Sequence, residues 1–151
     1  MKRRILILFV ALIPAIAFTN FHVKNEAAKA EVEEVVLKSY IHGAFNELNY
    51  EDMQAGFHED FAIFSADGET LKRYEIEDWV AGVKKRKAKA DFSPEANKWD
   101  HKFPNIDITG NSAVVKVELF KEGEHIYTDY LSLLKFDSGG KIVAKVYTKH
   151  E

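Results

Sequence analysis

Three stretches near the C-terminus decide the fold of this chain: residues 113–121 (AVVKVELFK), 125–136 (HIYTDYLSLLKF) and 141–149 (KIVAKVYTK). β-Branched and aromatic residues are frequent in all three, as is typical of strands in a half-buried sheet. Short glycine-containing segments, 121–124 and 137–140, separate them. Because the connections are this short, the pattern predicts consecutive antiparallel strands.

The residues before these strands predict mainly helices. Apolar side chains recur at helical spacing over residues 28–48 and 74–90, and a short helix is expected over residues 50–56. Residues 61–64 (FAIF) indicate a short strand, and residues 101–109 indicate one more long strand. Helices that precede a run of strands indicate an α+β domain, with the helices on one face of the sheet.

The N-terminus has the pattern of an export signal. Residues 2–4 are basic, residues 5–18 carry no charge, and small residues lead up to Ala17. We therefore expect cleavage after Ala17 and an exported protein, either periplasmic or secreted. The apolar stretch is shorter than the roughly 20 residues that a membrane-spanning helix needs. We expect no stable membrane span after cleavage, and an uncleaved anchor is the alternative.

These patterns divide the chain into a signal peptide at residues 1–17, a flexible tether at 18–27 and one folded domain at 28–150. With 151 residues, 46% of them hydrophobic, the chain is long enough for a single packed core. It contains no cysteine, so neither disulfides nor thiolate chemistry contribute.

The balance of charge favours acidic residues. Cleavage would reduce the 21 basic residues to 18, against 24 acidic ones, for a net charge of −6. We therefore expect no nucleic-acid partner. The six histidines show no metal-ligand spacing such as His-x-His, so we expect no metal and no cofactor.

Several short segments resemble one known superfamily in their order and spacing. They are residues 40–43 (YIHG), 53–58 (MQAGFH) with Asp60, Trp79, 127–131 (YTDYL) and 141–146 (KIVAKV). These segments resemble the nuclear-transport-factor-2-like (SnoaL-like) superfamily and, within it, the putative lumazine-binding family. The resemblance implies a cone-shaped fold, in which a curved antiparallel sheet wraps around N-terminal helices. It also implies a pocket for a small planar or mostly apolar molecule.

This superfold carries both enzymes and non-catalytic binding proteins, so function has to be argued from site residues. An isomerase site needs a carboxylate base, and an oxyanion hole made of a tyrosine and a protonated carboxyl group. The resemblance places Tyr40 at the tyrosine position, but Ser65 and Ser132 at the carboxylate positions. Asp67 and His58 remain as weak candidates for a catalytic base. We expect a non-catalytic protein, with an isomerase- or cyclase-type enzyme as the alternative.

Lys145 is a single charge within the apolar run of the last strand, and we expect it to point into the cone. It could pair with an acid such as Glu118, anchor an anionic ligand, or act as a catalytic amine. Alternation puts Tyr130 and Ser132 on one face of their strand and Asp129 on the other. By the resemblance, the face with Ser132 lines the cone, and Asp129 lies on the convex side, where members of the superfamily dimerise.

The predicted pocket is aromatic, with a few polar groups that orient a ligand. Tyr40 is expected to donate a hydrogen bond to the ligand, and Lys145 to anchor its charge. The residues expected to line the pocket are Tyr40, Phe57, Phe61, Trp79, Trp99, Tyr130, Ser132, Lys145 and Tyr147. We expect a small, mostly apolar or planar molecule as ligand, and a homodimer formed through the convex face of the sheet. A third possibility is an assembly module whose cone is filled by side chains.

Overall fold

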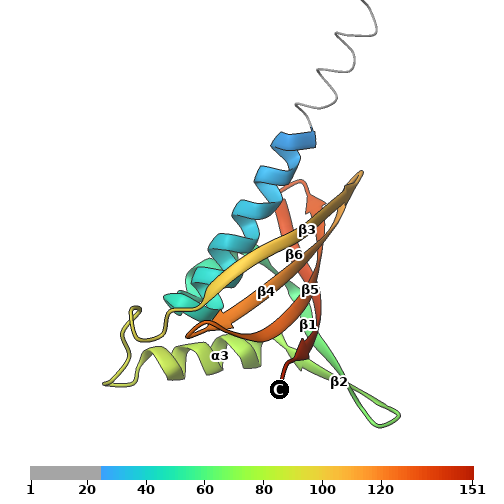
Figure 1. The fold of residues 1–151 in the computed structure, drawn as a ribbon. Helices are drawn as coiled ribbons and strands as arrows, with labels where there is room; N and C mark the ends of the chain where they lie inside the picture. The colour runs from blue at the N-terminus through green and yellow to red at the C-terminus, as the bar shows by residue number, and fades with distance from the viewer. Residues whose placement is uncertain (1–24) are drawn as a thin grey trace, which may run out of the picture.

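The computed structural model describes residues 25–151, which form a curved six-stranded sheet around a long helix (Figure 1). The strand order is β2-β1-β6-β5-β4-β3, and only β1 and β6 pair in parallel. The strands are β1 Phe57–Asp67, β2 Thr70–Glu75, β3 Asp100–Thr109, β4 Ser112–Lys121, β5 Glu124–Phe136 and β6 Gly139–Lys149. The predicted cone-shaped α+β fold is confirmed.

Helical structure gathers on the concave side of the sheet. The long helix is α-helical over residues 25–35 and continues as the wider π-helix η1, Val36–Asn46. It is followed by α2, Tyr50–Gly56, and later by α3, Ile76–Lys87, which crosses one end of the cone (Figure 1). The apolar side of η1 is fully buried against the sheet, and this contact forms the centre of the core.

Two glycines allow η1 and α2 to pack closely. A Cβ atom on Gly56 would lie 1.8 Å from Ser39 Oγ, and one on Gly43 would lie 3.0 Å from Met53 Cγ. Glycine at position 43 destabilises the helix interior, but it permits this close approach of α2. As a result, η1 and α2 pack in close contact with each other.

Some element boundaries differ from the predicted ones. Strand β1 is longer than residues 61–64, and β2 was not predicted at all, because each of its six residues is exposed or half-buried and shows no alternation. Residues 25–27, expected in the tether, are already helical. The predicted signal peptide and its cleavage after Ala17 lie outside the described residues. Within residues 25–151, no helix is long and apolar enough to cross a membrane.

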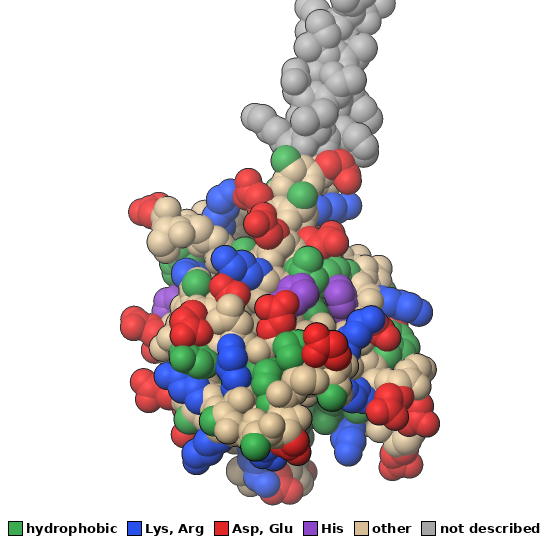
Figure 2. Space-filling view, turned by 90° about the vertical axis from the view of Figure 1, so that its left-hand side faces the viewer, with side chains coloured by type: hydrophobic (Ala, Val, Ile, Leu, Met, Phe, Trp, Pro, Cys, Tyr) green, Lys and Arg blue, Asp and Glu red, His purple; other side chains and the backbone are tan. Residues whose placement is uncertain are grey.

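The face of the molecule in Figure 2 carries acidic and basic side chains that are intermixed. Apolar side chains appear between them only in small groups. In salt solution the field of a surface charge extends only about 10 Å. Beyond that distance, neighbouring charges of opposite sign cancel. This face therefore offers no extended field of one sign to a distant partner.

Candidate ligand-binding site

An open pocket with a volume of about 500 Å³ lies on the concave side of the sheet, beside the β1–β2 hairpin. This volume falls within the range of about 300–1,000 Å³ that small-molecule sites usually have. The residues that line it are Phe45, Ile63, Ser65, Lys72, Arg73, Tyr74, Trp79, Tyr127, Lys145 and Tyr147. Five of them are aromatic, and Lys145 is the one charged residue among them that is buried.

A second cavity, of about 110 Å³, lies at the opposite end of the cone, between the N-terminal helix and the turn after β3. Its walls are almost entirely apolar, and its two charged residues, Glu31 and Lys135, form an exposed ion pair with each other. The larger pocket is therefore the better candidate for a ligand site, because a buried charged residue, Lys145, lies in its wall.

Three buried polar groups meet at the floor of the larger pocket. Lys145 Nζ lies 3.0 Å from Asp129 Oδ1 and donates a hydrogen bond of 2.6 Å to Tyr40 Oη. Tyr40 Oη in turn donates a hydrogen bond of 2.5 Å to Asp129 Oδ2. Tyr40 comes from η1, Asp129 from β5 and Lys145 from β6, so this floor triad ties the central helix to the middle of the sheet.

The contact between Lys145 and Asp129 is an ion pair without hydrogen-bond geometry. Asp129 Oδ1 is buried and accepts no hydrogen bond from the described residues, although Lys145 Nζ lies within 3.0 Å of it. The hydrogen bonds of the triad run instead through the phenol of Tyr40. The charges of the pair are therefore balanced, while Oδ1 retains an unused acceptor site.

The strand register explains why Asp129 and Lys145 meet. Residues directly opposite each other in a sheet share a face, and β6 pairs Lys145 with Leu131 and Tyr147 with Asp129. All of these except Tyr147 are buried. The expectation that Asp129 lies on the convex side is therefore wrong. Alternation separates the two faces of a strand but does not say which is buried, and a pairing lysine makes burial of the carboxylate tolerable.

The same register corrects three further expectations. Tyr130 pairs with Val146, and both side chains are about half exposed on the convex face, so Tyr130 does not line the pocket. Ser132 follows the same alternation and also lies on the convex side. Glu118, proposed as the acid for Lys145, forms an ion pair with Lys116 instead, at 3.1 Å.

Aromatic rings surround the ammonium group of Lys145. Its Nζ lies 5.0 Å from the ring centroid of Tyr40, 5.1 Å from Tyr147, 5.6 Å from Trp79 and 5.8 Å from Phe45. Separations below about 6 Å favour the charged form through the ring quadrupoles. The described geometry therefore combines a cation with an aromatic enclosure, which is a common arrangement at small-molecule sites.

Burial has opposite effects on the two proton donors of the triad. Desolvation lowers the pKa of Lys145, and the neighbouring charge of Asp129 acts against this shift. Desolvation raises the pKa of Tyr40 well above its usual value, and the neighbouring carboxylate of Asp129 raises it further. Tyr40 is therefore a neutral phenol whose proton is held toward Asp129.

The predicted aromatic residues lie at different depths. Trp79 and Tyr147 line the pocket with Lys145. Phe57 and Phe61 lie behind Trp79, at ring distances of 5.5 and 5.9 Å, as parts of the core.

Two further predicted residues also lie behind the wall of the pocket. Tyr40 is completely buried beneath the floor, so its predicted role as a donor to the ligand is wrong, because Asp129 accepts its proton. Trp99 packs against the rings of Phe45 and Tyr127, which do line the pocket.

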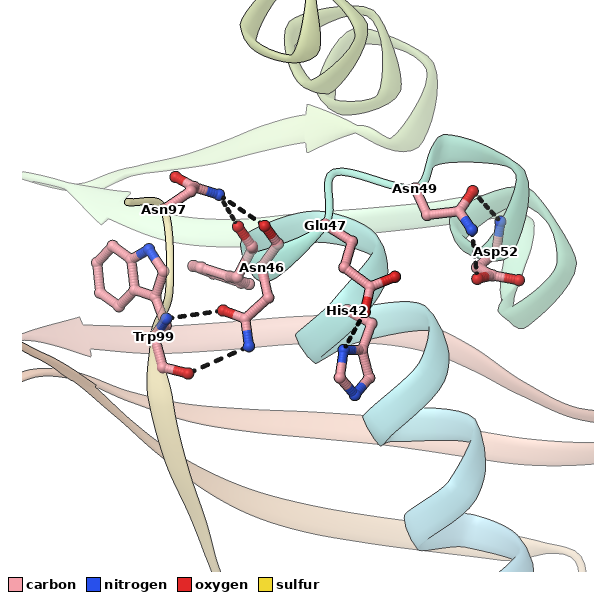
Figure 3. Close-up of polar contacts among 8 residues, drawn as sticks. His42, Asn46, Glu47, Asn49, Asp52, Asn97 and Trp99 are labelled. Atoms are coloured by element: carbon pink, nitrogen blue, oxygen red, sulfur yellow. Dashed lines mark hydrogen bonds and ion pairs between the residues drawn. The ribbon is translucent and has the colours of Figure 1, made fainter. Parts of the chain in front are cut away.

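A group of amides fixes the aromatic wall at the end of η1 (Figure 3). Asn46 Oδ1 accepts a hydrogen bond of 2.7 Å from the backbone N–H of Trp99, and Asn46 Nδ2 donates one to the Trp99 carbonyl. Asn97 Nδ2 donates to the carbonyl oxygens of Phe45 and Asn46. The last turn of the helix is thus bound to the loop before β3, and Phe45 is held in place. The sequence pattern did not indicate these contacts, since they join residues about 50 positions apart.

The two weak catalytic candidates do not line the pocket. Asp67 is at the exposed end of β1 and forms an ion pair with Lys72 at 2.5 Å. His58 Nδ1 accepts a hydrogen bond of 3.1 Å from the backbone N–H of Asp60, and its ring stacks on Phe136. Ser65 does line the pocket, and it supplies a hydroxyl at the position where the resemblance to isomerases would require a carboxylate. Among residues 25–151, no group of three or more His, Asp or Glu side chains is arranged to hold a metal ion.

Sequence reasoning also missed residues that contribute to the site. Phe45 and Tyr127 were not named as lining residues, and Asp129 was assigned to the wrong face. Tyr127 precedes Asp129 by two positions and so shares its face, and the wrong assignment of that face left both residues out of the predicted pocket. No sequence signal pointed to Arg73, which lies on the unpredicted strand β2.

The fold is that of a nuclear-transport-factor-2-like protein, and solved structures agree. A protein from Silicibacter pomeroyi superposes with a TM-score of 0.65 at 17% identity, over 83% of this chain and 98% of the other. Proteins from Shewanella baltica (TM-score 0.63, 24% identity, 83% and 95% covered) and Methylobacillus flagellatus (TM-score 0.61, 27% identity, 83% and 94% covered) are similar. All three are described as NTF2-like proteins of unknown function.

Residues 26–148 match the model of a family described as "Putative lumazine-binding". The match spans most of the chain, and the protein belongs to this family. The family assignment predicted from the short segments of the sequence is therefore confirmed. A search of curated proteins finds no match.

Proposed function

We propose that the protein binds a small, planar and largely apolar molecule in the 500 Å³ pocket and does not transform it. The observation that supports this proposal is Lys145, which is 5% exposed and yet belongs to the wall of an open pocket. A lysine that served the core alone would be expected to lie beneath closely packed side chains. Here the ion pair and the open cavity occur together.

The wall of the pocket suits a planar ligand with a carbonyl oxygen. An ammonium group has three N–H donors, of which one reaches Tyr40 Oη and one faces Asp129. We expect the third to donate to an acceptor atom of the ligand. The rings of Trp79, Tyr147 and Phe45 would pack against the faces or edges of a planar molecule.

Lumazine is a suitable first probe, since it is planar, carries carbonyl oxygens and appears in the description of the family. We expect saturable quenching of its fluorescence by the protein. Tyr147→Ala removes an aromatic wall and is expected to weaken binding about five-fold, or about 1 kcal/mol. Tyr130→Ala is the matched control, because Tyr130 has a similar exposure, 45% against 41%, on the opposite face of the sheet. Equal losses in both variants would show that the ligand does not occupy this pocket.

We further propose that the protein acts outside the cytoplasm, on the basis of its N-terminal sequence. Residues 1–17 have a basic start, an apolar middle and small residues before the expected cleavage point. The mature protein recovered from the producing cells is expected to begin at Phe18, as measured by intact mass. A mature protein that retains Met1 to Ala17 would contradict this proposal.

The convex face of the sheet supports a second proposal, a homodimer. Apolar side chains are exposed on three adjacent strands: Val114 on β4, Tyr130 and Leu134 on β5, and Val146 on β6. Single exposed apolar residues are common, but a group on neighbouring strands marks a contact surface. A two-fold axis through this group would cover it with the same surface of a second copy.

Sedimentation at micromolar concentration tests the dimer. Tyr130→Glu is expected to produce a monomer, because a charge would be buried at the centre of the contact. Leu71→Glu is the control, since Leu71 is more exposed but lies on the edge strand β2. A wild-type monomer would contradict the proposal.

A further inference from the structure

We infer that Asp129 makes the pocket selective for uncharged ligands with a hydrogen-bond acceptor, and against carboxylates of the same shape. This inference rests on the proposed function, and it adds the chemical class of the ligand. It differs from the expectation drawn from the sequence, in which Lys145 anchors the charge of an anion. The reason lies in the partner that the lysine already has.

The charges at the floor of the pocket cancel. Lys145 Nζ and Asp129 Oδ1 are 3.0 Å apart, and both residues are buried. Tyr40 on η1 adds no charge, since its proton lies in a hydrogen bond to Asp129. The other titratable groups that face this site are the phenols of Tyr127 on β5 and Tyr147 on β6. The floor therefore presents a dipole rather than a net positive charge.

An anion gains little from such a floor. A carboxylate must lose its water to enter an aromatic enclosure, and only an uncompensated positive charge could offset that cost. Near Lys145 it would also experience the repulsion of Asp129, which is strong where water is excluded. An uncharged carbonyl requires much less desolvation and needs only the remaining N–H of Lys145.

The rim of the pocket does not replace the missing charge. Its two cations are already paired: Lys72 with Asp67 at 2.5 Å, and Arg73 with Glu75 at 2.6 Å. All four side chains are substantially exposed, so water and salt screen their fields. Discrimination between a neutral ligand and an anion therefore depends on Asp129.

Two probes of the same shape test the inference, 2-naphthamide and 2-naphthoate at pH 7. We expect wild-type protein to bind 2-naphthamide at least about ten-fold more tightly than 2-naphthoate, as measured by calorimetry. Asp129→Asn keeps the shape of the side chain and removes its charge, so it should reverse the preference in favour of 2-naphthoate. Tyr40→Phe retains both charges and should preserve the wild-type preference.

A measurement on wild-type protein covers the case in which Asp129→Asn does not fold. Any 2-naphthoate that binds should bring a proton to neutralise Asp129, and calorimetry in two buffers of different ionisation enthalpy detects this uptake. The neutral amide should bind without it. Equal affinity for both probes, with no proton uptake, would overturn the selectivity and leave the binding pocket intact. Failure of lumazine and both naphthalene probes to bind would instead overturn the proposed function.

Discussion

Two Lys–Asp pairs, each with its lysine in the wall of the pocket, differ in burial more than in geometry. At the rim, Lys72 and Asp67 are 2.5 Å apart, and each side chain is 62% exposed. At the floor, Lys145 and Asp129 are 3.0 Å apart, with side chains 6% and 0% exposed. The shorter contact is therefore the one in water. Distance alone does not rank these two interactions.

The comparison shows that burial decides what an ion pair does. An exposed pair contributes at most about 1 kcal/mol, because water solvates both ions whether or not they meet. In a buried pair each ion depends on the other, since neither can recover its water when its partner is removed. Loss of one member of the floor pair therefore leaves an unpaired charge in the core, whereas loss of one member of the rim pair leaves a charge in water.

Removing one member of the floor pair should give the largest effect. Asp129→Ala leaves Lys145 charged, buried and without its acid, and we expect the free energy of unfolding to fall by about 3–5 kcal/mol. Urea denaturation measures this loss. The double variant Lys145→Met with Asp129→Leu removes both charges and should recover most of the stability. A loss below about 1 kcal/mol in Asp129→Ala would mean that the floor pair behaves like the rim pair.

At alkaline pH, the free energy of unfolding should depend on Tyr40, the third member of the triad. The pKa of Tyr40 is raised in the folded protein, so above a pH of about 10 the unfolded chain loses a phenol proton that the folded protein retains. This contribution to stability is complete below that pH and declines above it, by at most about 1.4 kcal/mol per pH unit. Between pH 9 and 11, the free energy of unfolding should therefore fall less steeply for Tyr40→Phe than for wild type. Identical slopes would show that Tyr40 ionises as easily in the folded protein as in the unfolded one.

The smallest effect is expected at the rim. Lys72→Ala should change the free energy of unfolding by less than about 0.5 kcal/mol, because Asp67 remains hydrated after the lysine is lost. Urea denaturation of Lys72→Ala and Asp129→Ala under the same conditions compares the two losses of stability directly. A change above about 2 kcal/mol would show that the β1–β2 hairpin depends on this pair.

The sequence patterns predicted the main helices and strands but missed the edge strand β2. The strands β4, β5 and β6 were predicted with nearly their observed bounds, because alternating apolar residues mark a surface that is buried on one side. Strand β2 was missed, since it lies at the edge of the sheet and none of its residues is buried. β2 pairs with β1 because a short turn joins the two strands. The hydrophobicity of its side chains does not indicate this pairing.

By itself, the amino-acid sequence determined the α+β cone, the family and the inward direction of Lys145. The α+β class follows from local patterns of apolar residues, which repeat along single helices and strands, whereas the cone, the family and the inward direction of Lys145 were implied by the resemblance of short segments to a known family. Only the tertiary structure decided that Asp129 faces Lys145, that Tyr40 lies between them, and that Tyr130 and Ser132 lie on the outside. The physical reason is that alternation leaves the choice of the buried face open. Here a carboxylate is buried because a lysine from the neighbouring strand and a phenol from the central helix meet it there.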